Sequence, residues 1–351
     1  MGDTDPRLDP YDYRLPPEAI ARNPPACRDG GRLLFSKGRN WIDGLIPDLV
    51  SAFAPGDVLV VNDTRVLSAR MYGHRSTGGR VELLLLEPGP GPVSAMIRPS
   101  KKVREGEVIS LISRDGATTP HTVCVGAPTS GGARMVELSS DPMEVMAHCG
   151  HVPLPPYMSR AATEDDEARY QTVFADQPGA VAAPTASLHL TTELLAALKA
   201  RGVEVHRVTL HVGAGTFRNL RPEDLDLGEL HREWYRIPET TAAAVMAAKV
   251  RGSAVTAVGT TVTRTLETAA AVDGHVSAGS GETTLFIRPG FNFQIVDRLL
   301  TNFHLPRTSL LMLVCAFGGR DHVMAGYAAA VERGLRFYSY GDAMLLERGE
   351  Q

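Results

Sequence analysis

Six side chains in this sequence are candidates for proton transfer, because each is an imidazole or a carboxylate expected near the end of a helix or strand. They are His189, His211, His231, His304, Glu233 and Asp342. An imidazole titrates near neutral pH, so it can both remove a proton and donate one. We expect the four histidine rings to converge on one pocket with the two carboxylates, and His189 and His211 are the first pair to test.

A second group of residues is suited to binding a substrate, because its members follow expected strands or stand in glycine turns. This group comprises Asn62, Asp63, Thr64, Arg65, Gly213, Gly215, Thr260, Thr261, Arg264, Asn302 and Tyr340. Thr260 and Thr261 begin an expected helix, whose free N–H groups favour an anion such as a carboxylate. Arg264 lies one helical turn further on and could hold the same carboxylate with two hydrogen bonds.

The tripeptide His231-Arg232-Glu233 has several interpretations. It fits the H-x-E part of the zinc deaminase motif, but the P-C-x-x-C part that this motif also requires is missing from the sequence. H-E-x-x-H is missing as well, so we expect no metal site. Glu233 could instead orient His231, or act as a base itself if burial raises the pKa of its carboxyl group.

The segments that must position these residues alternate between two kinds. Residues 58–61 are an apolar run typical of a strand buried on both faces. Further strands are expected over 203–210, 255–259, 285–287 and 337–340, and helices over 192–201, 239–251, 260–267, 293–300 and 322–333. Residues 309–317 fit either a strand or a buried helix. This alternation predicts a largely parallel α/β domain, either barrel-like or open.

The stretch between residues 66 and 150 has a different character. Short β-rich segments alternate there with glycine and serine turns, which predicts a small antiparallel barrel or sandwich. The expected strands cover 80–87, 93–98, 108–112, 121–125 and 133–138. We therefore divide the chain into a barrel-like α/β catalytic domain, residues 1–65 and 151–351, and an inserted β-barrel domain, residues 66–150.

Composition places the chain among ordinary globular proteins, with 351 residues, 43% of them hydrophobic and 22% charged. No apolar run reaches the roughly 18 residues that span a bilayer, and the N-terminus lacks the pattern of a signal peptide. The four cysteines are scattered, without a C-x-x-C pair. We expect a cytoplasmic monomer that does not contact membranes. The net charge of −4 argues against extensive phosphate contacts, although a local basic patch can suffice.

Several blocks of this sequence together resemble one known family. The blocks include NDTRV at 62–66, HVPLPPY at 151–157, the stretch 178–217, GTT at 259–261, TNFHLP at 301–306 and YSYGDAM at 338–344. They resemble the S-adenosylmethionine:tRNA ribosyltransferase-isomerases of queuosine biosynthesis. Matching blocks run in order from about residue 11 to residue 346, so the resemblance covers nearly the whole chain.

The resemblance implies a fold, a reaction and its participants. The fold is a barrel-like α/β domain with an inserted β-barrel. The enzyme uses S-adenosylmethionine as a ribosyl donor and transfers and isomerises this ribosyl group onto the aminomethyl group of 7-aminomethyl-7-deazaguanine in tRNA. The products are epoxyqueuosine, adenine and methionine. A base removes the C5′ proton that the sulfonium acidifies, adenine leaves, and the amine attacks the resulting electrophile. No metal is needed.

The sequence departs from the family pattern at several probable site loops. The family has two asparagines where this chain has Asn62-Asp63, Gly-Leu-His-Phe where it has Ser187-Leu188-His189-Leu190, and His-Ser-Glu-Tyr where it has His231-Arg232-Glu233-Trp234. These departures leave two alternatives open. One is the same donor chemistry on a small-molecule acceptor, and the other is a non-catalytic relative that binds a nucleoside or tRNA.

Overall fold

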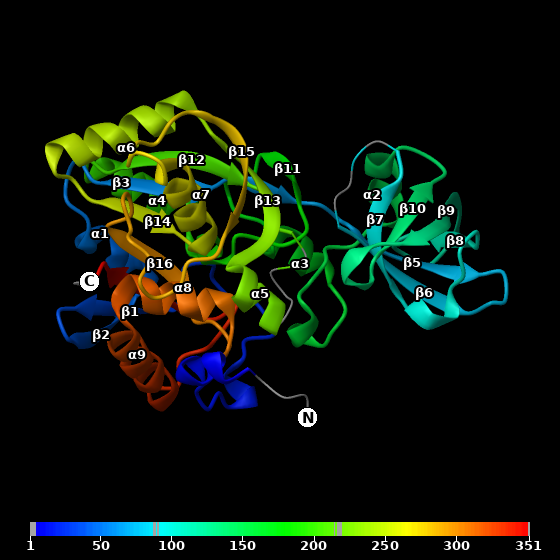
Figure 1. Cartoon of the computed structure of the whole chain (residues 1–351), viewed down its shortest axis with the longest axis horizontal. Coiled ribbons are helices and arrows are strands. Elements are labelled where there is room, and N and C mark those ends of the chain that lie inside the picture. Colours follow the sequence, from blue (N-terminus) through cyan, green and yellow to red (C-terminus); the bar gives the residue numbers. More distant parts are fainter. Residues whose placement is uncertain (1–4, 87–88, 90, 214, 216–219, 350–351) are drawn as a thin grey trace.

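The computed structural model describes residues 5–86, 89, 91–213, 215 and 220–349. Within these ranges the strands form a nine-stranded mixed sheet, a closed six-stranded antiparallel barrel and one two-stranded pair. Figure 1 shows the barrel to one side of the nine-stranded sheet and its helices. Residue 87 and residues 214, 216 and 217, which belong to segments named above, lie outside the described residues.

The nine-stranded sheet is parallel at its centre and antiparallel towards its edges. Its order is β15 (Gly279–Leu285), β13 (Glu229–Ile237), β12 (Glu204–Leu210), β3 (Val58–Asn62), β14 (Val255–Val258), β16 (Arg298–Asn302), β17 (Ala343–Glu347), β1 (Arg32–Lys37) and β2 (Asn40–Leu45). β3 pairs in parallel with β12 and β14, and β14 pairs in parallel with β16. These four strands therefore end at the same edge of the sheet.

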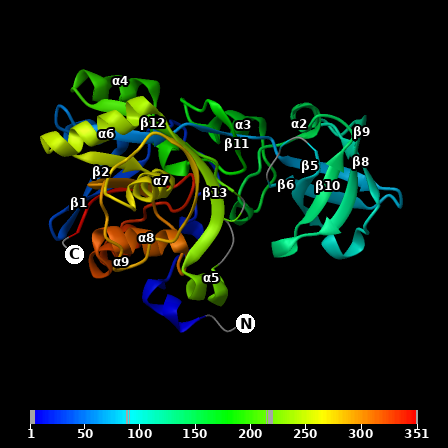
Figure 2. The same cartoon turned by 45° about the horizontal axis from the view of Figure 1, so that its top comes forward.

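Both faces of this sheet are covered, as the apolar run at 58–61 predicts. Successive side chains of a strand point to opposite faces. Val58 and Val60 accordingly join one core, while Leu59 and Val61 join another. The first core includes side chains of α6 (Glu239–Arg251), α7 (Thr260–Ala270), α8 (Ser309–Gly318) and α9 (Arg320–Glu332), and the second those of α1 (Leu49–Ala52) and α4 (Thr192–Ala200). Figure 2 shows α4, α6, α7, α8 and α9 around the strands of this sheet.

The barrel has its own core and closes on itself. It consists of β5 (Arg70–Arg75), β6 (Arg80–Leu85), β7 (Val93–Arg98), β8 (Val108–Ile112), β9 (Thr118–Pro128) and β10 (Arg134–Leu138). Helix α2 (Pro142–Cys149) packs Val145, Met146 and Cys149 into this core. The predicted antiparallel barrel within an α/β fold is thus confirmed. The domain boundaries at 65/66 and 150/151 stay a prediction.

Shorter elements connect the two sheets. Strands β4 (Thr64–Val66) and β11 (Gln177–Ala180) pair in parallel, and the short helices are α3 (Glu164–Arg169) and α5 (Pro222–Leu227). In the described part of the chain, no helix has the length and apolar character required to cross a membrane.

Three expected elements are wrong. The strand expected over 285–287 is the first, because β15 ends at Leu285. Residues 293–297 are not helical, and the strand β16 begins at Arg298. The N–H groups of Gln294, Ile295 and Val296 donate to the carboxylate of Glu267, which replaces the hydrogen bonds that a helix would supply. Residues 337–340 form only an isolated bridge, between Phe337 and Ile20, and the last strand is β17.

Candidate active site

A pocket of about 560 Å³ lies at the carboxyl ends of β14 and β16. This is the edge at which parallel α/β sheets usually bind their ligands. Its lining includes Thr260, Thr261, Thr301, Asn302, His304, Ser339 and the small-residue segment 182–186. Thr260 and Thr261 form the first turn of α7, and no side chain caps this turn. The uncapped N–H groups leave a favourable place for a negatively charged group.

Two buried polar atoms of the residues that line this pocket have no hydrogen-bond partner. They are the hydroxyl oxygen of Thr261 and the amide oxygen Oδ1 of Asn302. Buried polar atoms in native proteins nearly always have a partner, so an exception calls for an explanation. A polar ligand that contacts both atoms would supply the missing partners.

Asn302 also connects this pocket with His189. Its Nδ2 donates to His189 Nε2 at 3.1 Å and to the main-chain oxygen of Asp342 at 3.3 Å. Because the amide N–H₂ group can only donate, Nε2 of His189 accepts and the ring proton lies on Nδ1. Burial, together with the charges of Arg336 and Arg28, lowers the pKa of His189 to about 4. His189 is therefore neutral at pH 7.

Three further candidates near this pocket are tied to the fold. His304 bonds through Nε2 to the hydroxyl of Thr301 at 3.0 Å, and burial lowers its pKa to about 3. The two carboxylate oxygens of Asp342 accept hydrogen bonds from main-chain N–H groups, one from Arg32 at 2.8 Å and the other from Arg336 at 2.7 Å. Tyr340 donates to Asp166 at 2.9 Å. Asp342 thus holds β1 beside β17, and catalytic roles for it and for His304 stay predictions.

Glu233 lies at the centre of a buried charged cluster. One of its carboxylate oxygens accepts hydrogen bonds from Nε2 of His231 and from the main-chain N–H of Gly213, both at 3.0 Å. The other accepts a hydrogen bond from Nη1 of Arg264. Arg264 also donates from Nε to the main-chain oxygen of Leu285 at 2.9 Å. The guanidinium group thus faces Glu233, while its Nη2 is buried without a partner. Its predicted role as a clamp for the substrate carboxylate stays a prediction.

The ionisation state of Glu233 agrees with only one of the two roles expected from the sequence, that of orienting His231. Burial opposes ionisation, but the hydrogen bond from His231, the charge of Arg264 and the Gly213 N–H outweigh it and lower the pKa of Glu233. The condition for Glu233 to act as a base itself, a pKa raised by burial, is therefore not met, because His231 and Arg264 both pair with the carboxylate. Glu233 is ionised at neutral pH and orients His231.

Glycine at position 215 lets the main chain lie close to the ring of His231. A Cβ atom at this position would lie 2.5 Å from both Cγ and Nδ1 of His231, closer than van der Waals contact allows. Glu233 holds Nε2 with its proton, so Nδ1 carries the free lone pair. The ring is one quarter exposed, with 26% of its side-chain surface accessible. His231 therefore has the geometry of a general base.

Of the four polar residues at positions 62–65, three bond to residues 209–211 at the end of β12. Asn62 exchanges side-chain hydrogen bonds with the main chain of Leu210, which ties β3 to β12. Asp63 accepts the hydroxyl of Thr209 at 2.7 Å, and burial raises the pKa of its carboxyl group. Thr64 bonds to Nδ1 of His211 at 2.8 Å. Arg65 is exposed.

His211 is enclosed from two sides. Its ring stacks on Trp234, with ring centroids 4.9 Å apart. A Cβ atom at position 179 would lie 2.5 Å from its Nε2, so Gly179 makes room for the ring. Burial lowers the pKa of His211. The contacts with Thr64 and Trp234 fix its orientation near the ends of β3 and β12.

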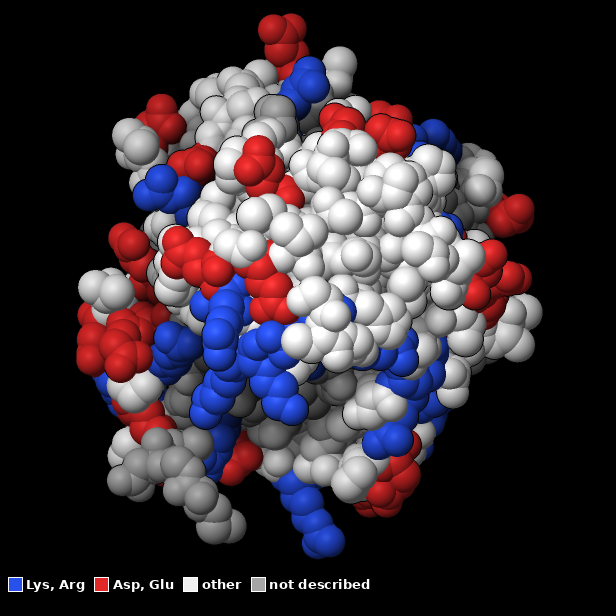
Figure 3. Space-filling model, turned by 90° about the vertical axis from the view of Figure 1, so that its right-hand side faces the viewer, with Lys and Arg blue, Asp and Glu red and all other residues white. Residues whose placement is uncertain are grey.

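A larger pocket of about 1940 Å³ lies beside His231. Its lining comes from the barrel, from the segment 153–160 and from Val181, Gly215 and Arg221. Four arginines contribute to it, namely Arg70, Arg98, Arg160 and Arg221. Figure 3 views the molecule from the barrel side and shows Lys and Arg side chains gathered across the lower half of this face. A polyanion is the ligand that such a surface favours.

The two pockets adjoin along the chain, because Val181 lines the larger one and Ala182 the smaller one. The histidines do not converge on either. His304 lines the smaller pocket, His231 the larger one, and His189 a third pocket of about 250 Å³ next to Tyr340. The expectation of one shared pocket is thus wrong, because Asn302, Thr64 and Glu233 each hold a different ring.

Sequence reasoning missed several residues that line the smaller pocket, including Thr301, Tyr338, Ser339 and the segment 182–186. The run of small residues in AVAAPTAS at 180–187 was the available signal, because small side chains let the backbone approach a ligand. Tyr338 has φ of 77°, a conformation that non-glycine residues adopt rarely and often at functional sites.

Known proteins are similar to this chain over almost its full length. A family model described as queuosine biosynthesis protein matches residues 8–346. An S-adenosylmethionine:tRNA ribosyltransferase-isomerase of Anaeromyxobacter dehalogenans (strain 2CP-C) is 49% identical over 352 residues, which cover 97% of this chain and 99% of the relative. The enzyme of the same name from Gloeobacter violaceus is 46% identical, with 97% and 96% covered.

A solved structure is also similar. The crystal structure of an S-adenosylmethionine tRNA ribosyltransferase from Thermotoga maritima matches with a TM-score of 0.54 and 32% sequence identity. The match covers 96% of this chain and 99% of that chain.

Proposed function

The chain belongs to the queuosine biosynthesis protein family, and we propose that it is an S-adenosylmethionine:tRNA ribosyltransferase-isomerase. It transfers and isomerises the ribosyl group of S-adenosylmethionine onto the aminomethyl group of 7-aminomethyl-7-deazaguanine in tRNA. Epoxyqueuosine, adenine and methionine are the products. The single observation that carries this proposal within the fold is the pair of adjoining pockets, one with unpartnered polar atoms and one lined by arginines.

The smaller pocket suits the donor. Small residues, hydroxyl groups and an amide line it, which suits a small polar ligand. The uncapped first turn of α7 favours the methionine carboxylate, as expected for Thr260 and Thr261. The Thr261 hydroxyl and the Asn302 amide oxygen then bond to polar groups of the donor.

The larger pocket suits the acceptor. A tRNA anticodon presents phosphates and splayed bases, and arginine side chains bind phosphates and stack on bases. Arg98 and Arg221 line this pocket on different parts of the chain, the former on the barrel strand β7 and the latter directly before α5. The formal net charge of −4 is compatible with this role, because a local cluster of arginines suffices.

His231 serves as the base in this proposal. The sulfonium of the donor acidifies the C5′–H bond, and Nδ1 of His231 removes this proton while ionised Glu233 stabilises the imidazolium. The ribose ring then opens with loss of adenine, and the aminomethyl nitrogen attacks the resulting electrophile. Methionine leaves when the bond between its sulfur and the ribosyl carbon breaks. Glu233 touches Arg264 and His231 rather than either pocket, so it acts as a positioning residue.

The remaining expectations from the sequence belong to the same proposal. The chain acts as a cytoplasmic monomer, contacts no membrane, and needs no metal for the transfer itself. The sulfonium already activates the C5′–H bond, so the reaction requires a base and hydrogen-bond donors rather than a Lewis acid.

Release of adenine tests the proposal. The purified full chain is incubated with S-adenosylmethionine and one of three acceptors: tRNA that carries 7-aminomethyl-7-deazaguanine, the same tRNA without the modification, or the free modified base. Adenine is quantified by liquid chromatography, and the nucleosides of digested tRNA are identified by mass spectrometry. We expect adenine and epoxyqueuosine in equal amounts, and only with the modified tRNA.

The other outcomes separate the alternatives. Adenine release with the free base but not with the modified tRNA would show a small-molecule acceptor and contradict the proposal. Tight binding of S-adenosylmethionine or tRNA without any adenine would show a non-catalytic binding protein. Unmodified tRNA serves as the control for adenine released without transfer.

A further inference from the structure

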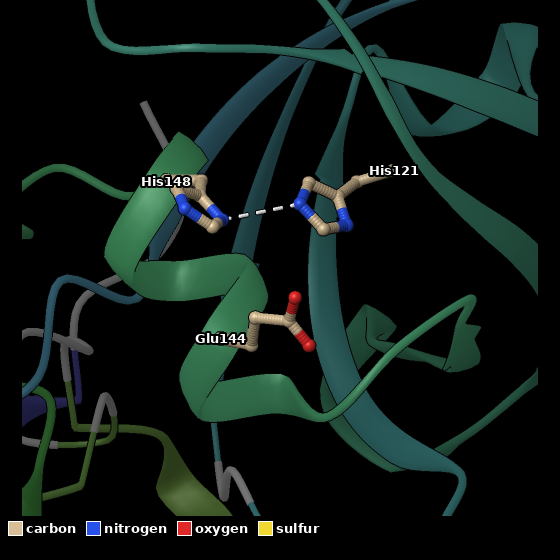
Figure 4. Close-up of side chains that lie close together, drawn as sticks. All are labelled: His121, Glu144 and His148. Carbon is tan, nitrogen blue, oxygen red and sulfur yellow. Dashed lines mark hydrogen bonds between the residues drawn. The ribbon is translucent and has the colours of Figure 1, made fainter.

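A cluster of metal-ligating side chains lies on the barrel, apart from both pockets of the proposed active site. It consists of His121 on β9 and of Glu144 and His148 on α2. Figure 4 shows the two imidazoles facing each other across the gap between the strand and the helix, with Glu144 one turn earlier on the same helix. We propose that these three residues bind a divalent transition metal of the zinc class.

The spacing of the two imidazole nitrogens fits such an ion. Nε2 of His121 and Nδ1 of His148 are 3.3 Å apart. Two nitrogens at about 2.0–2.1 Å from a tetrahedral zinc ion are separated by roughly 3.3–3.4 Å. The ligand atoms of all three residues lie within 4.8 Å of one another, and the exposed Glu144 side chain is free to approach further.

The fold presents these ligands on fixed elements. Glu144 and His148 are four residues apart on α2, so they project from the same side of the helix. The helix is anchored because Asp141 caps its first turn and because Val145, Met146 and Cys149 are buried in the barrel core. His121 is only 7% exposed, so its position is fixed by packing.

A neighbouring group supports the required tautomer of His121. The Ser140 hydroxyl lies 3.5 Å from Nδ1 of His121, at the limit of hydrogen-bond distance. With the proton on Nδ1 directed towards this oxygen, Nε2 is free to bind a metal. Metal-bound histidines usually donate their other ring N–H to such an acceptor.

The chemistry of the ligands selects the class of ion. Two imidazoles and one carboxylate suit Zn²⁺, whereas Mg²⁺ and Ca²⁺ prefer sites built from oxygen ligands alone. The proposal departs from the sequence-based expectation of no metal, because the pairing of residue 121 with residues 144 and 148 arises only from the packing of α2 on the barrel.

The inferred role is a cross-link within the barrel. Helix α2 leads directly to His151, whose main chain exchanges two hydrogen bonds with Arg70 at the start of β5. An ion held by both β9 and α2 would therefore fasten the point where the chain leaves the barrel to the barrel wall. An ion that binds the folded state stabilises it by mass action.

Titration with Zn²⁺ alone tests the proposal. The untagged full chain, stripped with a chelator, is titrated by calorimetry, and its Tm is measured with and without Zn²⁺. We expect one ion per chain and a higher Tm with Zn²⁺. His148→Ala should weaken binding by at least roughly ten-fold and remove the Tm increase, and Glu144→Gln should also weaken binding. Both residues are exposed, so the variants should keep the fold, which circular dichroism checks.

The control is His74→Ala, which removes an exposed histidine elsewhere on the barrel and should leave zinc binding unchanged. Co²⁺ provides a second probe, because four-coordinate cobalt bound to nitrogen and oxygen ligands has a characteristic visible absorption. The proposal is overturned if the wild-type chain binds no Zn²⁺, or if His148→Ala binds it as tightly as the wild type. His121 and His148 would then be linked by a hydrogen bond only.

Discussion

His231 owes its proposed role to two neighbours that restrict it from opposite sides. Glu233 holds Nε2, and the main chain at Gly215 lies close to Cγ and Nδ1 on the other side. Arg264 in turn keeps Glu233 ionised in a buried position, where an unpaired carboxylate would be strongly disfavoured. His231, Glu233 and Arg264 act as a unit, so substitution of any one of them should affect the same chemical step.

Substitution of His231 gives a prediction at the scale of the residue. His231→Ala should lower the rate of adenine release by about 100-fold or more, because a general base contributes on that order. The affinity for S-adenosylmethionine, measured by calorimetry, should change little. The matched control is His206→Ala, which removes another histidine paired with a glutamate, Glu204, at 3.4 Å.

The same measurements apply to His189 and His211, the pair that the sequence analysis named first for proton transfer. His189→Ala and His211→Ala should have smaller effects on the rate than His231→Ala, because hydrogen bonds to Asn302 and Thr64 hold their rings. A rate near normal in His231→Ala, with a 100-fold loss in either of the other two variants, would move the base to that residue.

The buried histidines predict how stability depends on pH. Burial lowers the pKa of His189 to about 4 and that of His304 to about 3, from an ordinary value of 6.5. Below pH 6.5 the unfolded chain therefore takes up protons that the folded chain does not. The free energy of unfolding should fall as the pH drops from 6.5 towards 4, by about 1.4 kcal/mol per pH unit for each histidine.

Denaturant unfolding at pH 7 and pH 5 checks this dependence. In His189→Gln the loss of stability between the two pH values should be smaller than in the wild type by about 1–2 kcal/mol. The exposed His275 provides the control, because His275→Gln should leave the loss unchanged. Equal losses in the wild type and in His189→Gln would mean that His189 is protonated in the folded chain as readily as in the unfolded chain.

At the scale of elements, helix α7 matters through its first turn. It follows β14 at Gly259, whose φ of 91° lets the chain turn directly from the strand into the helix. The first turn then faces the pocket without a capping side chain. An uncapped helix end at a buried place is unusual unless a ligand satisfies it.

Thr261 tests the function of this turn. Thr261→Val should weaken binding of S-adenosylmethionine by about five-fold, equivalent to roughly 1 kcal/mol for one hydrogen bond. The stability of the free protein should not fall, because the hydroxyl has no partner there. Thr265→Val is the control, since that hydroxyl bonds to the main-chain oxygen of Thr261 within the same helix. Unchanged donor affinity in Thr261→Val would place the donor elsewhere.

At the scale of the whole molecule, the barrel and the α/β sheet share the wall of the large pocket. Arg98 on the barrel and His231 on β13 both line it, although they are 133 positions apart in the sequence (231 minus 98). The barrel thus brings an exposed positive charge to the side of the proposed base. This arrangement predicts that tRNA binding depends on the barrel as well as on the catalytic residues.

Salt dependence of tRNA binding checks this role. Arg98→Gln should weaken tRNA binding several-fold and reduce the slope of log K against log salt concentration by about one, because one phosphate contact is lost. Arg39→Gln is the matched control: this exposed arginine follows β1 at the turn to β2, and Figure 1 places both strands on the side away from the barrel. An unchanged slope in Arg98→Gln would show that Arg98 does not contact phosphate.

Local sequence determined much of the fold. The apolar run at 58–61, the helix 239–251 and the strands 93–98 and 108–112 were predicted with the observed limits or nearly so, because turn residues and hydrophobic periodicity act over short distances. Thr191 caps α4 through its side chain, as threonine commonly does at the start of a helix. The family resemblance likewise depended on short motifs and placed the chain correctly.

Only the tertiary structure decided which polar groups meet. Residues 293–297 have a helical pattern, yet a carboxylate from α7 takes their N–H groups. Nothing local in the sequence indicates that Arg264 pairs with Glu233, which lies on the strand β13. Charges and hydrogen-bond partners distant in sequence approach each other only after the chain has folded, and burial then strengthens their interaction. The sequence by itself therefore determined the family and most elements, whereas the pairing of Glu233, the separation of the histidines and the cluster on the barrel follow from packing.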